Sequence, residues 1–491
     1  MAEPQLCDIS IPGRQGICYP EVDVPAAELL GELPEALLRK ELPMPELSEV
    51  DVIRHYTRLS QLNYSIDTGF YPLGSCTMKY NPKINEETAR LPGFAYAHPL
   101  QPIETVQGCL LLMYQLQEWL KEIGGLAGIT LQPAAGAHGE LTGVLIIRAY
   151  HSAHGDLKRN KILIPDSAHG TNPATSTMTG LRVVELKSDR RGNVDLDALR
   201  IECDDTLTGL MLTNPNTLGL FDENVLEVIR LVHEAGGLVY GDGANLNALL
   251  GIAKPGDLGI DVLHYNLHKT FSTPHGGGGP GSGPVGVAAH LVDFLPGPIV
   301  GIIEAGDDEE PPLYGYIMPS KSIGRVKAFN GHFGMMVRAF TYIMMHGPDG
   351  LRQVSEQAVL NANYLLALLK GTYHLPYDRV CMHEFVLEGK WEEAPEVRAL
   401  DIAKRLIDYK FHPPTNYFPL IVHEALMIEP TETESKETLD AFAQAMIRIA
   451  QEAHTDPELL KAAPHNTPVG RLDEVKAAKE LVLCCGVSPR E

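Results

Sequence analysis

From about residue 106, short runs of apolar residues alternate with segments of helical spacing. The apolar runs predict strands at residues 161–165, 183–186, 209–213, 238–240 and 262–266, and residues 141–150 are predicted as a helix. Short strands that alternate with helices are typical of a mostly parallel sheet covered by helices. The pattern therefore predicts an α/β fold for this part of the chain.

The pattern changes on both sides of this part. The first hundred or so residues are rich in proline and lack βα alternation, and Ser48 is predicted to cap a helix there. Beyond about residue 325 a long helix is predicted by apolar residues at helical spacing, namely Val326, Phe329, Phe333, Val337, Phe340 and Met344. Helices at 401–409 and 436–452 and a strand at 417–422 follow. We expect an N-terminal arm with helices at 1–105, a large domain at 106–325 and a smaller C-terminal α+β domain at 326–491.

Composition excludes several classes of function. The chain of 491 residues has 40 basic and 63 acidic side chains and a formal net charge of −23, which argues against nucleic acid or an anionic membrane as a general partner. Its apolar runs fall short of the about 18 residues of a membrane span, and its N-terminus does not resemble a signal peptide. Eight scattered cysteines without zinc spacing, including the adjacent Cys484 and Cys485, indicate reduced thiols, a cytoplasmic protein and no metal site.

Lys269 follows the predicted strand at 262–266 and shortly precedes four glycines at 276–279. A single lysine is most often a solvated surface charge, but α/β sheets bind ligands at the ends of their strands, where this lysine is expected. A P-loop is excluded because no Gly-Lys-Ser/Thr follows and residues 284–288 read as a strand. The glycines are interpreted as backbone that approaches a ligand closely. A lysine in this place favours a Schiff base with a carbonyl cofactor.

Asp242 is predicted to lie at the end of another buried strand. An ionised carboxylate there suits a protonated ring nitrogen, because a charge-assisted hydrogen bond of about 1.5–3 kcal/mol keeps such a ring electron-withdrawing. The small side chain of Ala244, two residues further, would let the ring lie close. Lys269 and Asp242 together are what a pyridoxal-phosphate site requires of a protein.

Five further residues are candidates, each with an ordinary structural alternative. Gly136 and Ala137 lie in a small-residue loop before a helix, which offers N–H groups to the cofactor phosphate but is equally explained by a tight turn. His169 follows a strand and suits stacking on a pyridine ring, whereas most histidines are structural. Asn216 offers an amide to the cofactor or substrate, or forms an Asn-Pro turn, and His268 either contacts phosphate or has no role.

Several long motifs, in one order, resemble a known family: the pyridoxal-phosphate-dependent glycine dehydrogenase (decarboxylating), the P-protein of the glycine cleavage system. The matching segments are residues 71–79 (YPLGSCTMK), 135–140 (AGAHGE), 167–174 (SAHGTNPA), 241–245 (GDGAN), 268–281 and 429–435 (EPTETES). The resemblance extends over roughly residues 40 to 485. The length is similar to that of the split form of the enzyme, and the chain resembles subunit 2, the half that carries the cofactor lysine.

The resemblance implies a fold and a role for individual residues. The fold would be the aspartate-aminotransferase type, fold type I, of pyridoxal enzymes. Lys269 would hold pyridoxal 5'-phosphate as a Schiff base, His169 would stack on its ring, Asp242 would pair with the ring nitrogen, and the Gly136–Ala137 loop would help to hold the phosphate. Ser75 and Cys76 would lie near the substrate, and Ser272 stands where the family often has a cysteine.

The resemblance also implies a reaction and partners. Glycine would lose its carboxylate as CO2, and the aminomethyl group would pass to the lipoyl arm of H-protein. The implied partners are glycine dehydrogenase subunit 1, in a heterotetramer with two copies of each subunit, lipoylated H-protein and glycine. Two alternatives stay open: another fold type I decarboxylase or aminotransferase, and a non-catalytic cofactor-binding subunit, against which the retention of Lys269, Asp242 and His169 argues.

Overall fold

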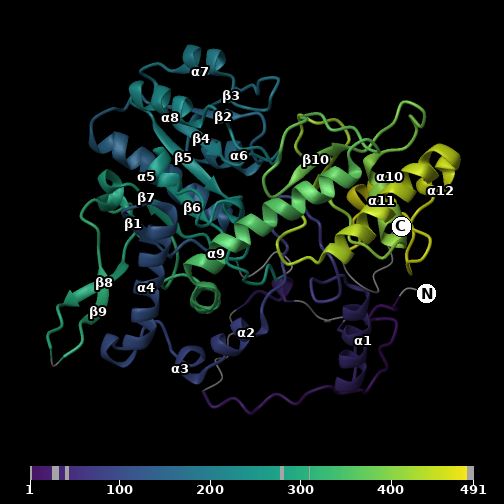
Figure 1. The fold of residues 1–491 in the computed structure, drawn as a ribbon. Coiled ribbons are helices and arrows are strands. Elements are labelled where there is room, and N and C mark those ends of the chain that lie inside the picture. Colours follow the sequence, from purple (N-terminus) through teal and green to yellow (C-terminus); the bar gives the residue numbers. More distant parts are fainter. Residues whose placement is uncertain (1–2, 25–32, 39–43, 277–280, 309, 484–491) are drawn as a thin grey trace. The chain divides into compact units, whose positions relative to one another are not determined.

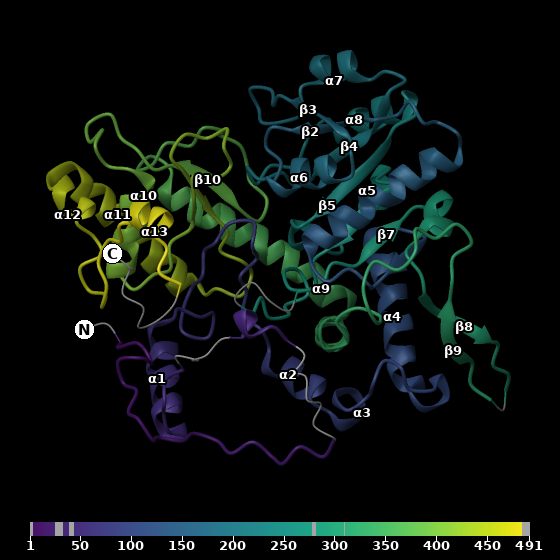
Figure 2. The same ribbon diagram turned by 180° about the vertical axis from the view of Figure 1, so that it is seen from behind.

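The structure, a computed structural model, describes residues 3–24, 33–38, 44–276, 281–308 and 310–483 (Figures 1 and 2). The chain divides into two compact units, one of residues 1–68 with 462–491 and one of residues 69–461. Gly277, Gly278, Gly279, Cys484 and Cys485 lie outside the described residues, so the expectations about them stay predictions. Within the described ranges, no helix combines the length and the apolar character needed to cross a membrane.

The smaller unit contains the 3-10 turn η2 (Glu35–Leu37), α1 (Glu49–Leu62) and α13 (Glu474–Lys479). Ser48 caps α1 as predicted: its hydroxyl accepts the N–H of Asp51, and the Asp51 carboxylate accepts the N–H of Ser48, both at 3.2 Å. This reciprocal pair satisfies two N–H groups that a helix start leaves without partners.

The larger unit is built around a seven-stranded sheet in the order β1-β7-β6-β5-β4-β2-β3. Its strands are β1 (Gly128–Thr130), β2 (Lys161–Pro165), β3 (Arg182–Leu186), β4 (Leu207–Thr213), β5 (Leu238–Gly243), β6 (Val262–Tyr265) and β7 (Val285–Val287). The strands from β6 to β3 run parallel to one another, whereas β7 is antiparallel to β6 and β1 is antiparallel to β7. The mostly parallel sheet and all five predicted strands are confirmed.

Helices cover both faces of this sheet. They are α4 (Gln107–Gly124), α5 (Gly136–Ala153), α6 (Thr171–Met178), α7 (Leu196–Glu202) and α8 (Val225–Glu234). Successive strand residues point to opposite faces, so Ile162 of β2 packs with Ile146 of α5, while Leu163 packs in the core that contains Val228 of α8. Burial on both faces explains why these strands read as continuous apolar runs.

Shorter elements complete the large part of this unit. They are α2 (Lys83–Ala89), α3 (Pro92–Ala95), the 3-10 turns η3 (Ile103–Thr105), η4 (Leu246–Ala248), η5 (Pro255–Leu258) and η6 (Ala289–Phe294), and the strands β8 (Ile299–Glu304) and β9 (Leu313–Ile317). The strands β8 and β9 pair only with each other, as an antiparallel hairpin beside α4 in both views (Figures 1 and 2).

The helical segment α9 (Phe333–Leu369), drawn in green in Figure 1, is broken at Gly347, whose φ of 62° is not helical, and it connects two hydrophobic cores. Its buried residues from Met336 to Val354 pack in the core of the large sheet, and those from Ala362 to Leu369 pack in a separate core. The prediction that the helix includes Val326 and Phe329 is wrong. Phe329 has a φ of 60°, in the left-handed region that an α-helix does not contain, and the helix begins only at Phe333.

The second core surrounds a three-stranded sheet in the order β10-β12-β11. Its strands are β10 (Phe385–Glu388), β11 (Thr415–Asn416) and β12 (Ala425–Ile428), and its helices are α10 (Ala399–Asp408), α11 (Lys436–Thr455) and α12 (Pro457–Lys461). The predicted strand at 417–422 is wrong, because Tyr417 has a φ of 61° and Pro419 has no N–H to donate. Within α9, the two cores separate between Val354 and Ala362 and not near residue 325, and the three-domain division stays a proposal.

Candidate active site

A cavity of about 180 Å³ opens at the carboxyl ends of the parallel strands. Strands β2, β4, β5 and β6 each contribute side chains from their last residues or from the segment that follows. The lining residues are Ser75, Gly136, Ala137, Glu140, His169, Thr171, Thr213, Thr217, Asp242, Ala244, Asn245, His264, Asn266, His268 and Lys269. Eight of the predicted site residues are thus brought together here: Lys269, His169, Asp242, Ala244, Gly136, Ala137, His268 and Ser75.

Lys269 lies shortly after the end of β6, in a turn that main-chain hydrogen bonds stabilise. Its N–H donates to the carbonyl of Asn266 at 3.1 Å, and the N–H of Ser272 donates to the carbonyl of Lys269 at 3.2 Å. Phe271, fully buried, anchors this turn in the core. The Nζ of Lys269 donates to the carbonyl oxygen of Ser75 at 2.7 Å. The lysine is therefore held by main-chain contacts at both its ends, with its amine in the cavity.

Asp242, in β5, is a buried carboxylate with polar partners around it. It accepts the N–H of Ala244 at 3.0 Å and the side-chain amide of Asn172 at 3.3 Å, and Nε2 of His264 lies 3.5 Å away. Burial pushes the pKa of Asp242 upward, but His264, the Ala244 N–H and the charge of Lys269 together hold that pKa below its usual value. Asp242 is therefore an anion at neutral pH, as a partner for a protonated ring must be.

His264 is a site residue that the sequence interpretation missed. It lies in β6 directly beside Asp242, because these two positions pair in the parallel ladder of β5 and β6. Its ring contacts the hydroxyl of Tyr240 on one side and the amide of Asn266 on the other, and burial lowers its pKa. An alignment of the two predicted strands that places their polar residues side by side would have paired His264 with Asp242. Asn172 lies in α6, where no strand pairing points to Asp242.

His169 stands at the exposed side of the cavity, after β2. The N–H of Thr171 donates to its Nδ1 at 3.2 Å, and its ring meets that of Phe418 edge to face, with centroids 5.5 Å apart. Burial and the charge of Lys269 lower the pKa of His169. A neutral imidazole fixed by Thr171 in this way suits stacking on a flat ring more than ion pairing.

Glu140, in the first turns of α5, is the second buried carboxylate of the cavity. It accepts the hydroxyls of Thr171 at 2.6 Å and Thr175 at 3.3 Å. Burial, followed by the charge of Asp242, raises the pKa of Glu140 to about 7. The cavity thus holds one carboxylate that stays ionised and one that takes up a proton near neutral pH.

Gly136 and Ala137 open α5, and the cap residue Ala135 offers no side chain to the free N–H groups of its first turn. These groups and the helix dipole attract an anion at this end of the helix. The space is close: a Cβ at Gly136 would lie 2.6 Å from the side-chain oxygen of Asn266. A lysine amine, an ionised carboxylate and an uncapped helix start around one cavity fit pyridoxal phosphate, whose aldehyde, ring nitrogen and phosphate need these three partners.

The remaining predicted residues differ in their placement. His268 lines the cavity, and burial lowers its pKa to about 3, so its ring is neutral and its Nδ1 accepts the N–H of Ser282 at 3.3 Å. The Asn216 side chain donates to the carbonyl of Gly192 and accepts the N–H of Leu218, so that it stabilises a turn and does not line this cavity. Cys76 does not line it either, and burial raises the pKa of its thiol to about 11.

Comparison with known proteins places the chain in a family. The family model "Glycine dehydrogenase, C-terminal domain" matches residues 354–465. The chain is 61% identical over 481 residues, 97% of its length and 98% of the relative's, to a probable glycine dehydrogenase (decarboxylating) subunit 2 of Caldanaerobacter subterraneus subsp. tengcongensis. It is 60% identical over 479 residues, 97% of both chains, to the protein of the same name from Alkaliphilus oremlandii.

Solved structures support the same fold. A glycine decarboxylase (P-protein) of the glycine cleavage system, in inhibitor-bound form, matches with a TM-score of 0.72 and 23% identity over 86% of this chain and 94% of that one. A cysteine desulfurase from Thermococcus onnurineus matches with a TM-score of 0.59 and 16% identity over 78% of this chain and 95% of that one. The fold type I class predicted from the sequence is confirmed. On its sequence identity along almost the whole length, the chain belongs to the family of glycine dehydrogenase (decarboxylating) subunit 2.

Proposed function

We propose that the cavity around Lys269 is where this chain, as a pyridoxal-phosphate enzyme, decarboxylates glycine, and that the aminomethyl group then passes to the lipoyl arm of H-protein. The family assignment supports the reaction. The observation that carries the site is the convergence of the Lys269 amine, the ionised Asp242 and the open start of α5 on one cavity.

The cofactor supplies an electron-withdrawing ring that accepts the electron pair left when the bond from carbon to carboxylate breaks. The residues of the chain prepare that chemistry. Lys269 would provide the amine that anchors the cofactor aldehyde, the N–H groups from Gly136 onward would bind its phosphate, and the ionised Asp242 would pair with its ring nitrogen. His169, at the exposed side of the cavity, would stack on the ring.

Glu140 is a second group able to hold a proton in the cavity. Because its pKa is about 7, it exists in both protonation states near neutral pH, which suits a group that gives or takes a proton during turnover. Its neighbour Thr171 donates its hydroxyl to Glu140 and its N–H to Nδ1 of His169, so that one residue holds both titratable groups.

We propose two kinds of partner. The family name indicates a subunit 1, and we propose a heterotetramer with two copies of each subunit in the cytoplasm. Lipoylated H-protein is proposed as the acceptor, because a decarboxylated glycine fragment needs a carrier. The negative charge of the chain supports the exclusion of nucleic acid as a partner.

Substitution of Lys269 by alanine tests the site. The wild-type protein, purified with pyridoxal phosphate, is expected to show the visible absorbance of a lysine Schiff base, and Lys269→Ala is expected to lose it, because no other amine side chain lines the cavity among the described residues. Lys254→Ala, at an exposed ion pair with Glu122, is the matched control and should keep the absorbance. An unchanged spectrum in Lys269→Ala would rule out this lysine as the anchor.

A further inference from the structure

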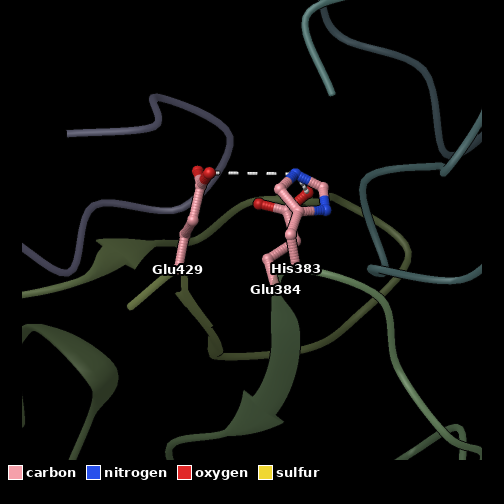
Figure 3. Close-up of side chains that lie close together, drawn as sticks. All are labelled: His383, Glu384 and Glu429. Carbon is pink, nitrogen blue, oxygen red and sulfur yellow. Dashed lines mark ion pairs between the residues drawn. The ribbon is translucent and has the colours of Figure 1, made fainter. Parts of the chain in front are cut away.

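Two buried carboxylates lie at the end of the small sheet, next to the cavity but outside its lining. Glu384 directly precedes β10 and Glu429 directly follows β12, and these strands pair in antiparallel register with Phe385 opposite Ile428. The next positions outward are therefore the two glutamates, which point the same way as His383 (Figure 3). All three side chains are fully buried.

Both carboxylates bind the same short segment, residues 75–77. Glu384 accepts the N–H of Ser75 at 2.6 Å and its hydroxyl at 2.9 Å. Glu429 accepts the N–H of Thr77 at 2.8 Å and its hydroxyl at 2.6 Å. Each glutamate thus holds one residue by its main chain and its side chain at once, a geometry in which the segment has little freedom.

The held segment has an unusual backbone. Ser75 has a φ of 57° and Thr77 a φ of 49°, both in the left-handed region that side chains with a Cβ rarely adopt. Such residues cost free energy and persist only where surrounding contacts fix them. The four hydrogen bonds from Glu384 and Glu429 are contacts of this kind.

The carbonyl oxygen of Ser75 is the acceptor of the Lys269 amine, at 2.7 Å. The direction of that carbonyl depends on the backbone of residue 75 and thus on the contact between Ser75 and Glu384. We propose that Glu384 and Glu429 are positioning residues for Lys269: they clamp residues 75–77 so that the Ser75 carbonyl holds the lysine amine in the cavity. The proposal rests on Lys269 being the cofactor lysine.

Charge and burial favour a hydrogen-bond clamp over an ion pair. Burial and the mutual repulsion of the carboxylates raise the pKa of Glu384 well above its usual range, and burial raises that of Glu429 to about 7. His383 is no counter-ion, because burial lowers its pKa to about 3; its Nε2 lies 3.9 Å from Glu384 and 3.8 Å from Glu429. Glutamine at position 384, neutral and able to accept and donate, therefore preserves the clamp, whereas alanine removes it.

The test measures how cofactor-free protein forms the Schiff base between pyridoxal phosphate and Lys269. Pyridoxal phosphate is added back, and two quantities are measured: the rate at which the Schiff-base absorbance grows, and the fraction of bound cofactor that borohydride reduction links to Lys269. We expect Glu384→Ala and Glu429→Ala to slow the growth by about tenfold and to lower the linked fraction, as the loss of hydrogen bonds to a carboxylate predicts. Glu384→Gln is expected to stay within about twofold of the wild type.

Two further variants separate positioning from folding. Glu452→Ala removes a carboxylate from α11 that pairs with Arg405, so it destabilises the same part of the chain without touching residues 75–77, and it should leave the linked fraction unchanged. Thr77→Val keeps the shape of Thr77 and removes one donor to Glu429, so it replaces the alanine variants if they do not fold, with an expected slowing of about threefold.

Each outcome decides between separate claims. A wild type that forms no Schiff base overturns the proposed function. A wild type that forms it while Glu384→Ala, Glu429→Ala and Thr77→Val form it at the same rate and extent overturns only the clamp. The clamp would also be overturned if a metal ion co-purified with the wild type and its removal by a chelator slowed the growth of the Schiff-base absorbance to the rate of Glu384→Ala. That result would favour a metal centre at His383, Glu384 and Glu429.

Discussion

Asp242 and Glu140 are two buried carboxylates in one cavity whose pKa values move in opposite directions. Asp242 faces His264, the Ala244 N–H and the charge of Lys269, all of which favour the anion. For Glu140, burial and the charge of Asp242 raise the pKa more than the hydroxyls of Thr171 and Thr175 and the charge of Lys269 lower it, so the neutral acid is favoured. This difference assigns a permanent charge to one residue and a proton-holding role to the other.

The raised pKa of Glu140 predicts a pH-dependent effect on stability. The folded-state pKa, about 7, lies above the ordinary value of 4.5, so Glu140 costs no stability below pH 4.5. Between pH 4.5 and 7 the unfolded chain ionises while the folded protein keeps its proton, so stability falls over this window, and the full loss is reached above pH 7. In cofactor-free protein, Glu140→Gln should therefore raise the free energy of unfolding at pH 8 by up to about 3 kcal/mol, and by less than about 1 kcal/mol at pH 5. Urea unfolding at the two pH values measures this.

Glu86→Gln is the matched control, because a hydrogen bond from Arg338 lowers the pKa of Glu86. That substitution should lower stability at pH 8, the opposite sign. If Glu140→Gln lowered stability at pH 8 as well, Glu140 would be ionised in the folded protein at no cost.

At the scale of elements, the site is assembled from the ends of parallel strands and the start of one helix. The β5–β6 ladder sets Asp242 beside His264, and α5 opens with small residues against Asn266. The end of the β10–β12 pair places Glu384 and Glu429 on the segment that meets Lys269. The placement of these side chains therefore depends on the register of paired strands and on the close contact between α5 and Asn266.

Gly136→Ala tests the role of the helix start. The added Cβ would lie 2.6 Å from the Asn266 side-chain oxygen, and Asn266 is buried with its amide 2.6 Å from His264, so a shift of this side chain would disturb that contact. We expect the dissociation constant of pyridoxal phosphate to rise by about tenfold or more, since the phosphate loses N–H contacts worth about 1 kcal/mol each. Fluorescence titration of cofactor-free protein measures it.

Gly108→Ala provides the comparison. Gly108 lies in α4, and a Cβ added there would have no neighbouring atom within 4 Å, so alanine should leave cofactor affinity unchanged and raise stability by about 0.5–1 kcal/mol. Equal affinities in Gly136→Ala and the wild type would show that the phosphate binds elsewhere.

The sequence predicted the elements whose residues carry a local pattern. The strand at 161–165 and the cap at Ser48 are found as predicted, because burial on both faces and a capping box leave their marks within a few residues. Val326 and Phe329 have helical spacing but a turn intervenes, and Pro419 interrupts the run at 417–422. Apolar spacing does not reveal a left-handed residue.

The same limit applies to the site. Lys269, Asp242 and His169 were identified because each follows a predicted strand, where α/β sheets bind ligands. Glu384 and Glu429 are more than 300 residues from Ser75 and Thr77 in the sequence and meet them only through the tertiary fold. Asn216 follows a strand like the others, but its side chain closes its own turn.

At the scale of the larger unit, residues from 75 to 429 surround the proposed active site or contact the residues that line it. The large sheet holds the cavity, α9 joins its core to that of the small sheet, and the small sheet reaches Lys269 through residues 75–77. The family model covers 354–465 and so includes both glutamates of the clamp.

The most direct test of glycine decarboxylation at Lys269 is the exchange of labelled CO2 into the carboxyl group of glycine. The assay uses this chain with its subunit 1 and lipoylated H-protein, because carboxyl exchange requires the bond between carbon and carboxylate to break and re-form at the cofactor. We predict label in glycine with the wild type and with Lys254→Ala, and none above background with Lys269→Ala. Label incorporation by Lys269→Ala at the wild-type rate, or none by a wild-type complex that contains the cofactor, would contradict the account.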